Sequence, residues 1–198
     1  MITEVRGPQT GGDNRGQWFE VYNASGSEVD LRGLRVEFFD LQGGRPEPKR
    51  PILMRANDLT VPPGGYVTLG NHDPNIQPEF VDYSFIVDYF TDADEGDTDD
   101  LGFGDDVVRQ PKDFLRAGRI DMSACGVLID RLRYTDLPSQ GTLSLDGSTE
   151  PDAEANDDPN NFCTNDAEEV LEPGEPRIYI GLPGTPQEEN PPCSGDAG

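Results

Sequence analysis

The sequence has few cationic residues, and this shortage excludes several classes of protein. Its 198 residues include 15 Lys and Arg against 39 Asp and Glu, which gives a formal net charge of −24. So acidic a surface repels a phosphate backbone, and we therefore expect no nucleic-acid partner. A single histidine and the absence of a Gly-x-Ser-x-Gly sequence leave no nucleophilic triad in view, so we expect no catalytic residues and no enzyme.

Long apolar runs are also missing. The longest are three residues, as at 52–54, 85–87 and 127–129, which is far short of the ~18 needed to span a bilayer. We expect no direct membrane insertion. The chain does not open on a basic segment followed by an apolar one, so we expect that a signal peptide is not present in this chain.

What the sequence does contain points to strands. Gly (23) and Pro (18) are abundant and hydrophobic residues make up 33%, which favours many short segments joined by turns. Apolar and polar residues alternate in short stretches that end at Gly, Pro, Asn or Asp, as in half-buried strands. We predict an all-β fold in which two antiparallel sheets form a β-sandwich. The predicted strands cover residues 2–5, 17–23, 34–39, 59–61, 66–69, 83–89, 119–122, 127–134, 142–145 and 177–180.

The same alternation predicts which side chains face the core. In 127–134 the apolar spacing is not strictly two, and a bulge near Asp130 would reconcile it. The side chains predicted to be buried are Phe19, Val21, Leu34, Val36, Phe38, Val67, Leu69, Leu143 and Leu145.

The chain is predicted to form one domain with two irregular parts, because its length suits one core rather than two. Residues 1–147 are assigned to the β-sandwich, with a long insertion at about 90–116 where the alternation stops. Residues 148–198 are acidic and rich in proline at first. We expect them to form an irregular C-terminal strap with a late strand, packed on the same domain.

The strongest chemical feature is a run of acids within the insertion. Eight Asp and Glu lie in residues 92–106, with no Lys or Arg among them. Closely spaced carboxylates suit a hard cation such as Ca²⁺. The order of Gly and Asp does not fit an EF-hand, so a solvated acidic surface and neutralisation by the basic segment 109–119 stay open as alternatives. We expect no cofactor, with calcium as the one alternative. The candidate metal ligands are Asp92, Asp94, Asp97 and Asp99.

Three cysteines allow one disulfide and leave one thiol over. The small number of cysteines, the extracellular type of composition and the need to anchor a strand-poor C-terminal strap favour a bridge between Cys163 and Cys193. Cys125 is then the unpaired residue. A bridge between Cys125 and Cys163 is the alternative, because Cys125 also lies beside a turn at Gly126.

Two aromatic positions and the single histidine have simple structural interpretations. His72 lies between Gly70-Asn71 and Asp73-Pro74, and we expect a solvated loop residue. Trp18 and Tyr22 share one strand face. We expect Trp18 to close the edge of the core, and the alternative is a stacking platform for sugars or a partner.

A series of segments is informative by its order and spacing. They are 2–5 (ITEV), 16–23 (GQWFEVYN), 29–34 (VDLRGL), 61–70 (VPPGGYVTLG), 125–126 (CG), 129–131 (IDR), 141–146 (GTLSLD), 156–159 (NDDP), 161–163 (NFC) and 181–186 (GLPGTP). This series resembles the lamin tail domain as it occurs in secreted and surface proteins of bacteria. The resemblance covers most of the chain except roughly 90–116.

The resemblance implies an immunoglobulin-like β-sandwich that is usually appended to other proteins and carries no catalytic residues. Phe162 stands where many relatives have Trp. We expect a non-catalytic interaction or adhesion module of a secreted or cell-surface protein, located outside the cell or at its surface, with a protein or cell-surface partner. Two alternatives stay open: a Ca²⁺- or carbohydrate-binding β-sandwich that uses the acidic 92–106 loop, and an accessory domain of a larger extracellular hydrolase.

Overall fold

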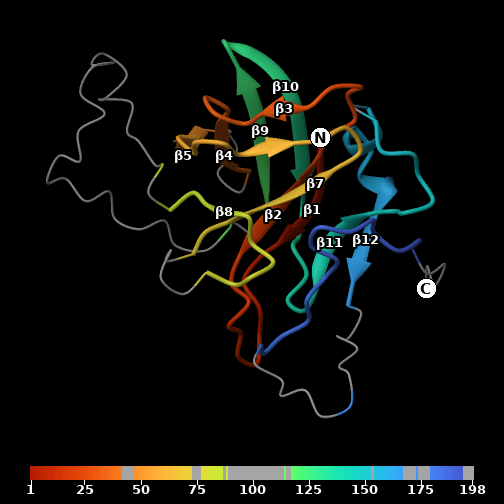
Figure 1. Cartoon of the computed structure of the whole chain (residues 1–198). Coiled ribbons are helices and arrows are strands. Elements are labelled where there is room, and N and C mark those ends of the chain that lie inside the picture. Colours follow the sequence, from red (N-terminus) through yellow and green to blue (C-terminus); the bar gives the residue numbers. More distant parts are fainter. Residues whose placement is uncertain are drawn as a thin grey trace, which may run out of the picture.

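Nearly all regular structure in the described chain is β-strand, so the fold is all-β, as predicted. The computed structural model (Figure 1) describes residues 1–41, 47–72, 77–86, 88, 114, 117–152, 154–166, 173 and 179–193, with the backbone alone at 47–50. The strands are β1 (Ile2–Arg6), β2 (Trp18–Tyr22), β3 (Val29–Asp30), β4 (Arg35–Asp40), β5 (Glu47–Leu53), β6 (Thr60–Val61), β7 (Tyr66–Gly70), β8 (Tyr83–Ser84), β9 (Gly118–Ala124), β10 (Val127–Tyr134), β11 (Thr142–Leu145) and β12 (Phe162–Asn165). Two single-turn 3-10 helices, η2 (Ala155–Asp157) and η3 (Pro159–Asn161), precede β12.

The strands form two main sheets and one small one. The six-stranded sheet has the order β12-β11-β1-β2-β7-β8, the four-stranded sheet has the order β10-β9-β4-β5, and β3 pairs with β6. Every pair is antiparallel except β7 with β8, which run parallel, so the six-stranded sheet is mixed. The prediction of wholly antiparallel sheets is therefore wrong for this pair. A parallel pair needs a long connection rather than a tight hairpin, and residues 71–82 provide it.

One apolar core draws on both main sheets. The ring of Phe19 on β2 meets the ring of Phe38 on β4 at 6.0 Å between centroids, and Phe38 stacks on Phe114 at 5.3 Å. The predicted core side chains are buried, with one exception: Leu143 is only partly buried at the margin of the core. Leu145 is buried in a separate small cluster with Met1 and Ala155.

Two predicted strands differ from those in the structure. The strand predicted at 83–89 ends at Ser84, since Phe85 and Ile86 leave the extended pairing. The late strand predicted at 177–180 is not formed at Tyr179 and Ile180, and its first two residues lie outside the described part.

Three observed strands lie where the sequence predicts none: β5, β12 and the two-residue strand β3. β12 falls in the part of 148–198 that was expected to be irregular, and it pairs with β11 through Phe162 opposite Leu145. β5 contains two prolines, which argue against a central strand. β5 is an edge strand, where a missing N–H costs no ladder hydrogen bond.

The bulge predicted near Asp130 is confirmed. The register between β9 and β10 shifts between Leu128 and Asp130, so Ile129 has no partner across the ladder. The predicted insertion at about 90–116 lies outside the described residues apart from Phe114.

Candidate functional site

The hairpin of β9 and β10 carries the most exposed apolar group in the described chain. Its tip extends beyond the neighbouring strands at the top of Figure 1. The exposed fractions of Val127, Leu128 and Ile129 are 65%, 48% and 51%. Residues 123–129, which we call the hairpin tip, contain no charged side chain. Adjacent large apolar side chains that stay in water mark a contact surface more often than scattered ones do.

The local sequence explains why this tip projects. Cys125 and Gly126 both have positive φ, at 51° and 76°, which is the backbone of the tight two-residue turn that matches strand twist. Below the tip, the guanidinium of Arg131 donates to both carboxylate oxygens of Asp121, each at 2.7 Å. The guanidinium of Arg119 lies 3.7 Å from the ring centroid of Phe39. The base of the hairpin is thus braced while its tip is free of such contacts in the described chain.

A second notable surface lies on the six-stranded sheet, on the side away from the core. Val5 and Phe19 point into the core, so by strand alternation Glu4 and Glu20 point to the opposite side, which we call the outer face. Both glutamates are nevertheless fully buried. The cover is the C-terminal segment 181–193, which we call the strap.

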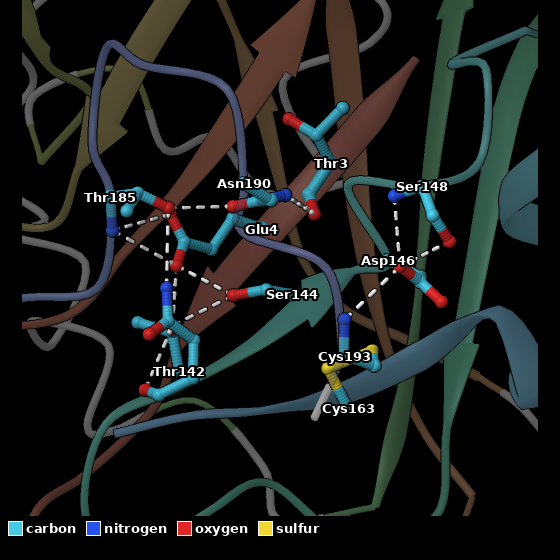
Figure 2. The surroundings of a disulfide bond; sticks show 11 residues. Thr3, Glu4, Thr142, Ser144, Asp146, Ser148, Cys163, Thr185, Asn190 and Cys193 are labelled. Atoms are coloured by element: carbon cyan, nitrogen blue, oxygen red, sulfur yellow. Dashed lines mark hydrogen bonds between the residues drawn. A yellow bond between two sulfur atoms is a disulfide. The ribbon is translucent and has the colours of Figure 1, made fainter. Parts of the chain in front are cut away.

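The strap is fastened to the outer face by donors of its own backbone. The amide N–H of Gln187 donates to Glu20 at 2.7 Å, and the amide N–H of Thr185 donates to Glu4 at 3.3 Å. The side-chain amide of Asn190 donates to the carbonyl of Thr3 at 3.1 Å, as Figure 2 shows. These bonds hold the strap across β1 and β2.

The two glutamates belong to a polar row that crosses the sheet. Ser144, Glu4, Glu20 and Thr68 are successive register partners on β11, β1, β2 and β7. Burial is the main cause that raises the pKa of Glu4 to about 7, against hydrogen bonds from hydroxyls and the strap. Burial, followed by the charge of Glu4, raises the pKa of Glu20 well above its usual value. Burial therefore favours the protonated form of both glutamates.

The disulfide between Cys163 and Cys193 is confirmed. Their Cα atoms lie 5.8 Å apart, and the bridge joins β12 to the end of the strap (Figure 2). Asp146 supports the same end, because its Oδ1 accepts from the N–H of Cys193 at 3.1 Å and from the N–H of Ser148 at 2.9 Å. Cys125 is the free and exposed thiol.

The prediction for His72 is wrong. The side chain is buried, and its Nε2 lies 2.8 Å from the carbonyl oxygen of Arg15. A carbonyl only accepts, so Nε2 carries the proton and donates. Burial lowers the pKa of His72, which keeps the ring neutral. The ring fits because Gly16 and Gly70 leave room: a Cβ at either position would lie within 2.4 Å of it.

The prediction that Trp18 has a structural role is correct, but the predicted position at the edge of the core is wrong. Trp18 is fully buried, so it cannot act as an exposed stacking platform. It lies on the outer face, where its ring meets that of Phe80 at 6.4 Å between centroids, rather than at the edge of the core. Tyr22, on the same side, packs against Tyr66 at 4.8 Å.

The predicted metal ligands Asp92, Asp94, Asp97 and Asp99 lie outside the described residues. Among the described residues, no group of three or more His, Cys, Asp or Glu is arranged to hold a metal ion. In the same part of the chain, no helix is long and apolar enough to cross a membrane.

The sequence analysis missed Glu4 and Glu20. Each occupies the polar position of an alternating strand, which normally indicates a solvated side chain. Their register partners Ser144 and Thr68 are small and uncharged, but this pairing is known only from the structure and gave no signal in the sequence.

Comparison with known proteins does not add an assignment. No family model, no curated protein and no solved structure matches the chain.

Proposed function

We propose that the chain is a non-catalytic interaction module of a secreted or cell-surface protein, built as an immunoglobulin-like β-sandwich of the lamin tail type. Two sheets that share one apolar core support the sandwich. The Cys163–Cys193 disulfide supports an oxidising compartment, because such bridges persist mainly outside the cytosol. The order of the sequence segments supports the lamin tail resemblance.

The hairpin tip is the observation that carries this function. It is an uncharged, exposed apolar group on a chain whose net charge is −24. Arg133 lies further along β10 and is exposed. The tip therefore fits a protein partner with an apolar recess and an acidic rim, since a buried apolar centre with a polar rim is the usual anatomy of such contacts.

The test compares a tip variant with a matched variant elsewhere. Leu128→Asp places a charge on the tip, while Val29→Asp makes the same kind of change on β3, where Val29 is also exposed. Both are made with Cys125→Ser, so that the exposed thiol forms no adventitious bond. Immobilised protein is used to capture a partner from the extracellular fraction of the native host, and the captured protein is then purified.

Direct calorimetry with the purified partner decides the result. Leu128→Asp is expected to weaken binding at least ~10-fold, because a charge at the centre of an apolar contact costs more than ~1.4 kcal/mol. Val29→Asp is expected to bind as the parent does. Equal binding by the two variants, or no purified protein that binds, would overturn the assignment of the tip as the contact surface.

A further inference from the structure

The strap covers a pair of carboxylates that face each other across neighbouring strands. Glu4 on β1 and Glu20 on β2 are register partners, and both are fully buried. In the described part of the chain, the donors to these two carboxylates are outer-face hydroxyls and backbone N–H groups of the strap. Glu4 accepts from the hydroxyls of Thr142 and Ser144, and Glu20 accepts from the hydroxyl of Thr3 at 2.8 Å.

The strap supplies the donors that close the site. The N–H groups of Thr185 and Gln187 reach the two carboxylates, one each. The hydroxyl of Thr185 donates to the side-chain oxygen of Asn190 at 2.7 Å, which holds the strap in its curved path (Figure 2). The seal over Glu4 and Glu20 therefore depends on the strap staying in place.

The charges around the pair are mostly of one sign. Arg6 on β1 faces Glu4, but it is paired with Asp13 at 2.8 Å. Asp82, next to β8, faces Glu20 and binds the side-chain amide of Gln187. Tyr66 on β7 faces Glu20, and Glu189 of the strap faces Tyr66. The neighbours on β11, Thr142 and Ser144, are uncharged. Among the described residues, no Lys or Arg forms a salt bridge with Glu4 or Glu20, so the two carboxylates, if both were ionised, would repel each other without a paired cation.

The geometry points to a pH-gated strap: it lies closed over the outer face while Glu4 and Glu20 share at least one proton, and it opens when both are ionised. The Cys163–Cys193 bridge keeps the opened strap tethered to β12. Opening would uncover the polar row of Ser144, Glu4, Glu20 and Thr68. This inference is independent of the hairpin tip, which lies on the other main sheet.

Two opposing electrostatic effects determine whether the strap opens at high or at low pH. Ionisation strengthens each hydrogen bond to a carboxylate, which favours the closed strap. Burial and the mutual repulsion of the pair act the other way, and they dominate, since the pKa of Glu4 is raised to about 7 and that of Glu20 is also raised. A group whose pKa is raised by the closed state favours that state at low pH and opposes it as pH rises through the raised value. The strap therefore closes in acid and opens in mild alkali.

Hydrogen exchange of the intact, oxidised chain tests the gate. Protection factors, corrected for the intrinsic effect of pH on exchange, are measured for peptides from the strap and from β4 at about pH 5.5 and about pH 8.5. Strap amides are expected to lose at least ~10-fold in protection at the higher pH, while β4 amides keep theirs. Equal strap protection at the two pH values would overturn the proposal.

Variants distinguish the contribution of Glu4 and Glu20 to the pH response from that of the acidic residues around them. The double change Glu4→Gln and Glu20→Gln removes both titrations and is expected to abolish the pH response of the strap. Asp82→Asn removes a nearby exposed acid that also contacts the strap, and it is expected to leave the pH response in place. A double variant that responds to pH as the parent does would overturn the proposal.

If the double variant does not fold, titration of the two glutamates in the unmodified protein tests the proposal instead. The carboxyl carbons of Glu4 and Glu20 are followed by NMR in the unmodified protein. Midpoints above about 6 for at least one of them, reached together with the loss of strap protection, are the expected result. Midpoints near 4.3 for both glutamates would overturn the gate, because that is the value of a solvated glutamate.

Discussion

The imidazole of His72 occupies the space that a side chain at Gly16 would need. A Cβ built at Gly16 would lie 2.1 Å from Nε2 of the ring, and Gly16 has a positive φ of 69°. The same Nε2 donates to the carbonyl of Arg15, one residue earlier. The histidine and the glycine therefore depend on each other, and each of the two can be changed alone.

Gly16→Ala is expected to destabilise the protein by ~2–4 kcal/mol, because it combines a strained φ with a clash against a buried ring. The control is Gly26→Ala, since a Cβ at Gly26 meets nothing within 4 Å and its φ is not in the left-handed region. Urea unfolding of the two variants gives the comparison. Equal midpoints would mean that the ring of His72 moves aside at little cost.

Protonation of His72 is expected to weaken the fold in acid. Burial lowers the pKa of the folded histidine below its usual 6.5, so the unfolded chain takes up a proton first as pH falls. The stability that the neutral ring provides is thus present above pH 6.5 and is lost as pH falls below it. His72→Gln keeps a donor for Arg15 but does not titrate. The difference in unfolding free energy between parent and variant should therefore narrow from about pH 7 to about pH 5; a constant difference would contradict this.

Removing the disulfide is expected to lower the free energy of unfolding by ~3–4 kcal/mol, according to the chain-entropy model for a bridge between residues 30 positions apart. The variant is Cys163→Ser with Cys193→Ser, and unfolding by urea is the measurement. Cys125→Ser is the matched control, because that thiol is free and exposed. A loss of stability in the control equal to that in the double variant would assign the effect to serine rather than to the bridge.

The loss of unfolding free energy on truncating a core side chain to Ala is expected to increase with the burial of that side chain. Val36 and Leu69 are fully buried, so Val36→Ala and Leu69→Ala should cost ~2–4 kcal/mol. Leu143→Ala should cost less than Leu69→Ala, because Leu143 lies at the margin of the core and is only partly buried. Chemical unfolding of the three variants provides the ranking, and a larger loss at Leu143 than at Leu69 would contradict it.

The acidic segment 92–106 is expected to bind Ca²⁺ weakly at most. A true site would stabilise the protein in a saturable way at millimolar Ca²⁺, persist in high NaCl, and disappear in the variant with Asp94→Asn and Asp97→Asn. Thermal unfolding with Ca²⁺, with EDTA and with NaCl alone separates the cases. Stabilisation by NaCl alone, with no added effect of Ca²⁺, would leave the segment as a solvated acidic surface.

Local alternation was enough to predict much of the fold. Strands β2, β4 and β7 each place apolar side chains on one face, and the bulge before Asp130 follows from a break in the same spacing. β5 escaped prediction because its prolines are tolerated only at a sheet edge, and a sequence does not say which strand lies at an edge.

The burial of side chains by segments distant in the sequence was harder to predict than the strands. Alternation shows that Glu4 and Glu20 lie on the polar face, but the strap that buries them has no periodic pattern of its own. His72 is similar, because its burial depends on Gly16 and Gly70, which belong to separate segments of the chain. The Cys163–Cys193 bridge was the exception, since only three cysteines limited the choice.

The bridge also decides how the domain would respond to mechanical tension. A pull on Cys193 is carried by a covalent bond into Cys163, so it reaches β12 without first peeling the strap from β1 and β2. In the described sheet, β12 is an edge strand whose ladder partner is β11. In the oxidised state, the hydrogen bonds between β11 and β12 would therefore be the first in the sheet to bear the force. After reduction, the strap would detach from β1 and β2 before any strand of the sheet separates.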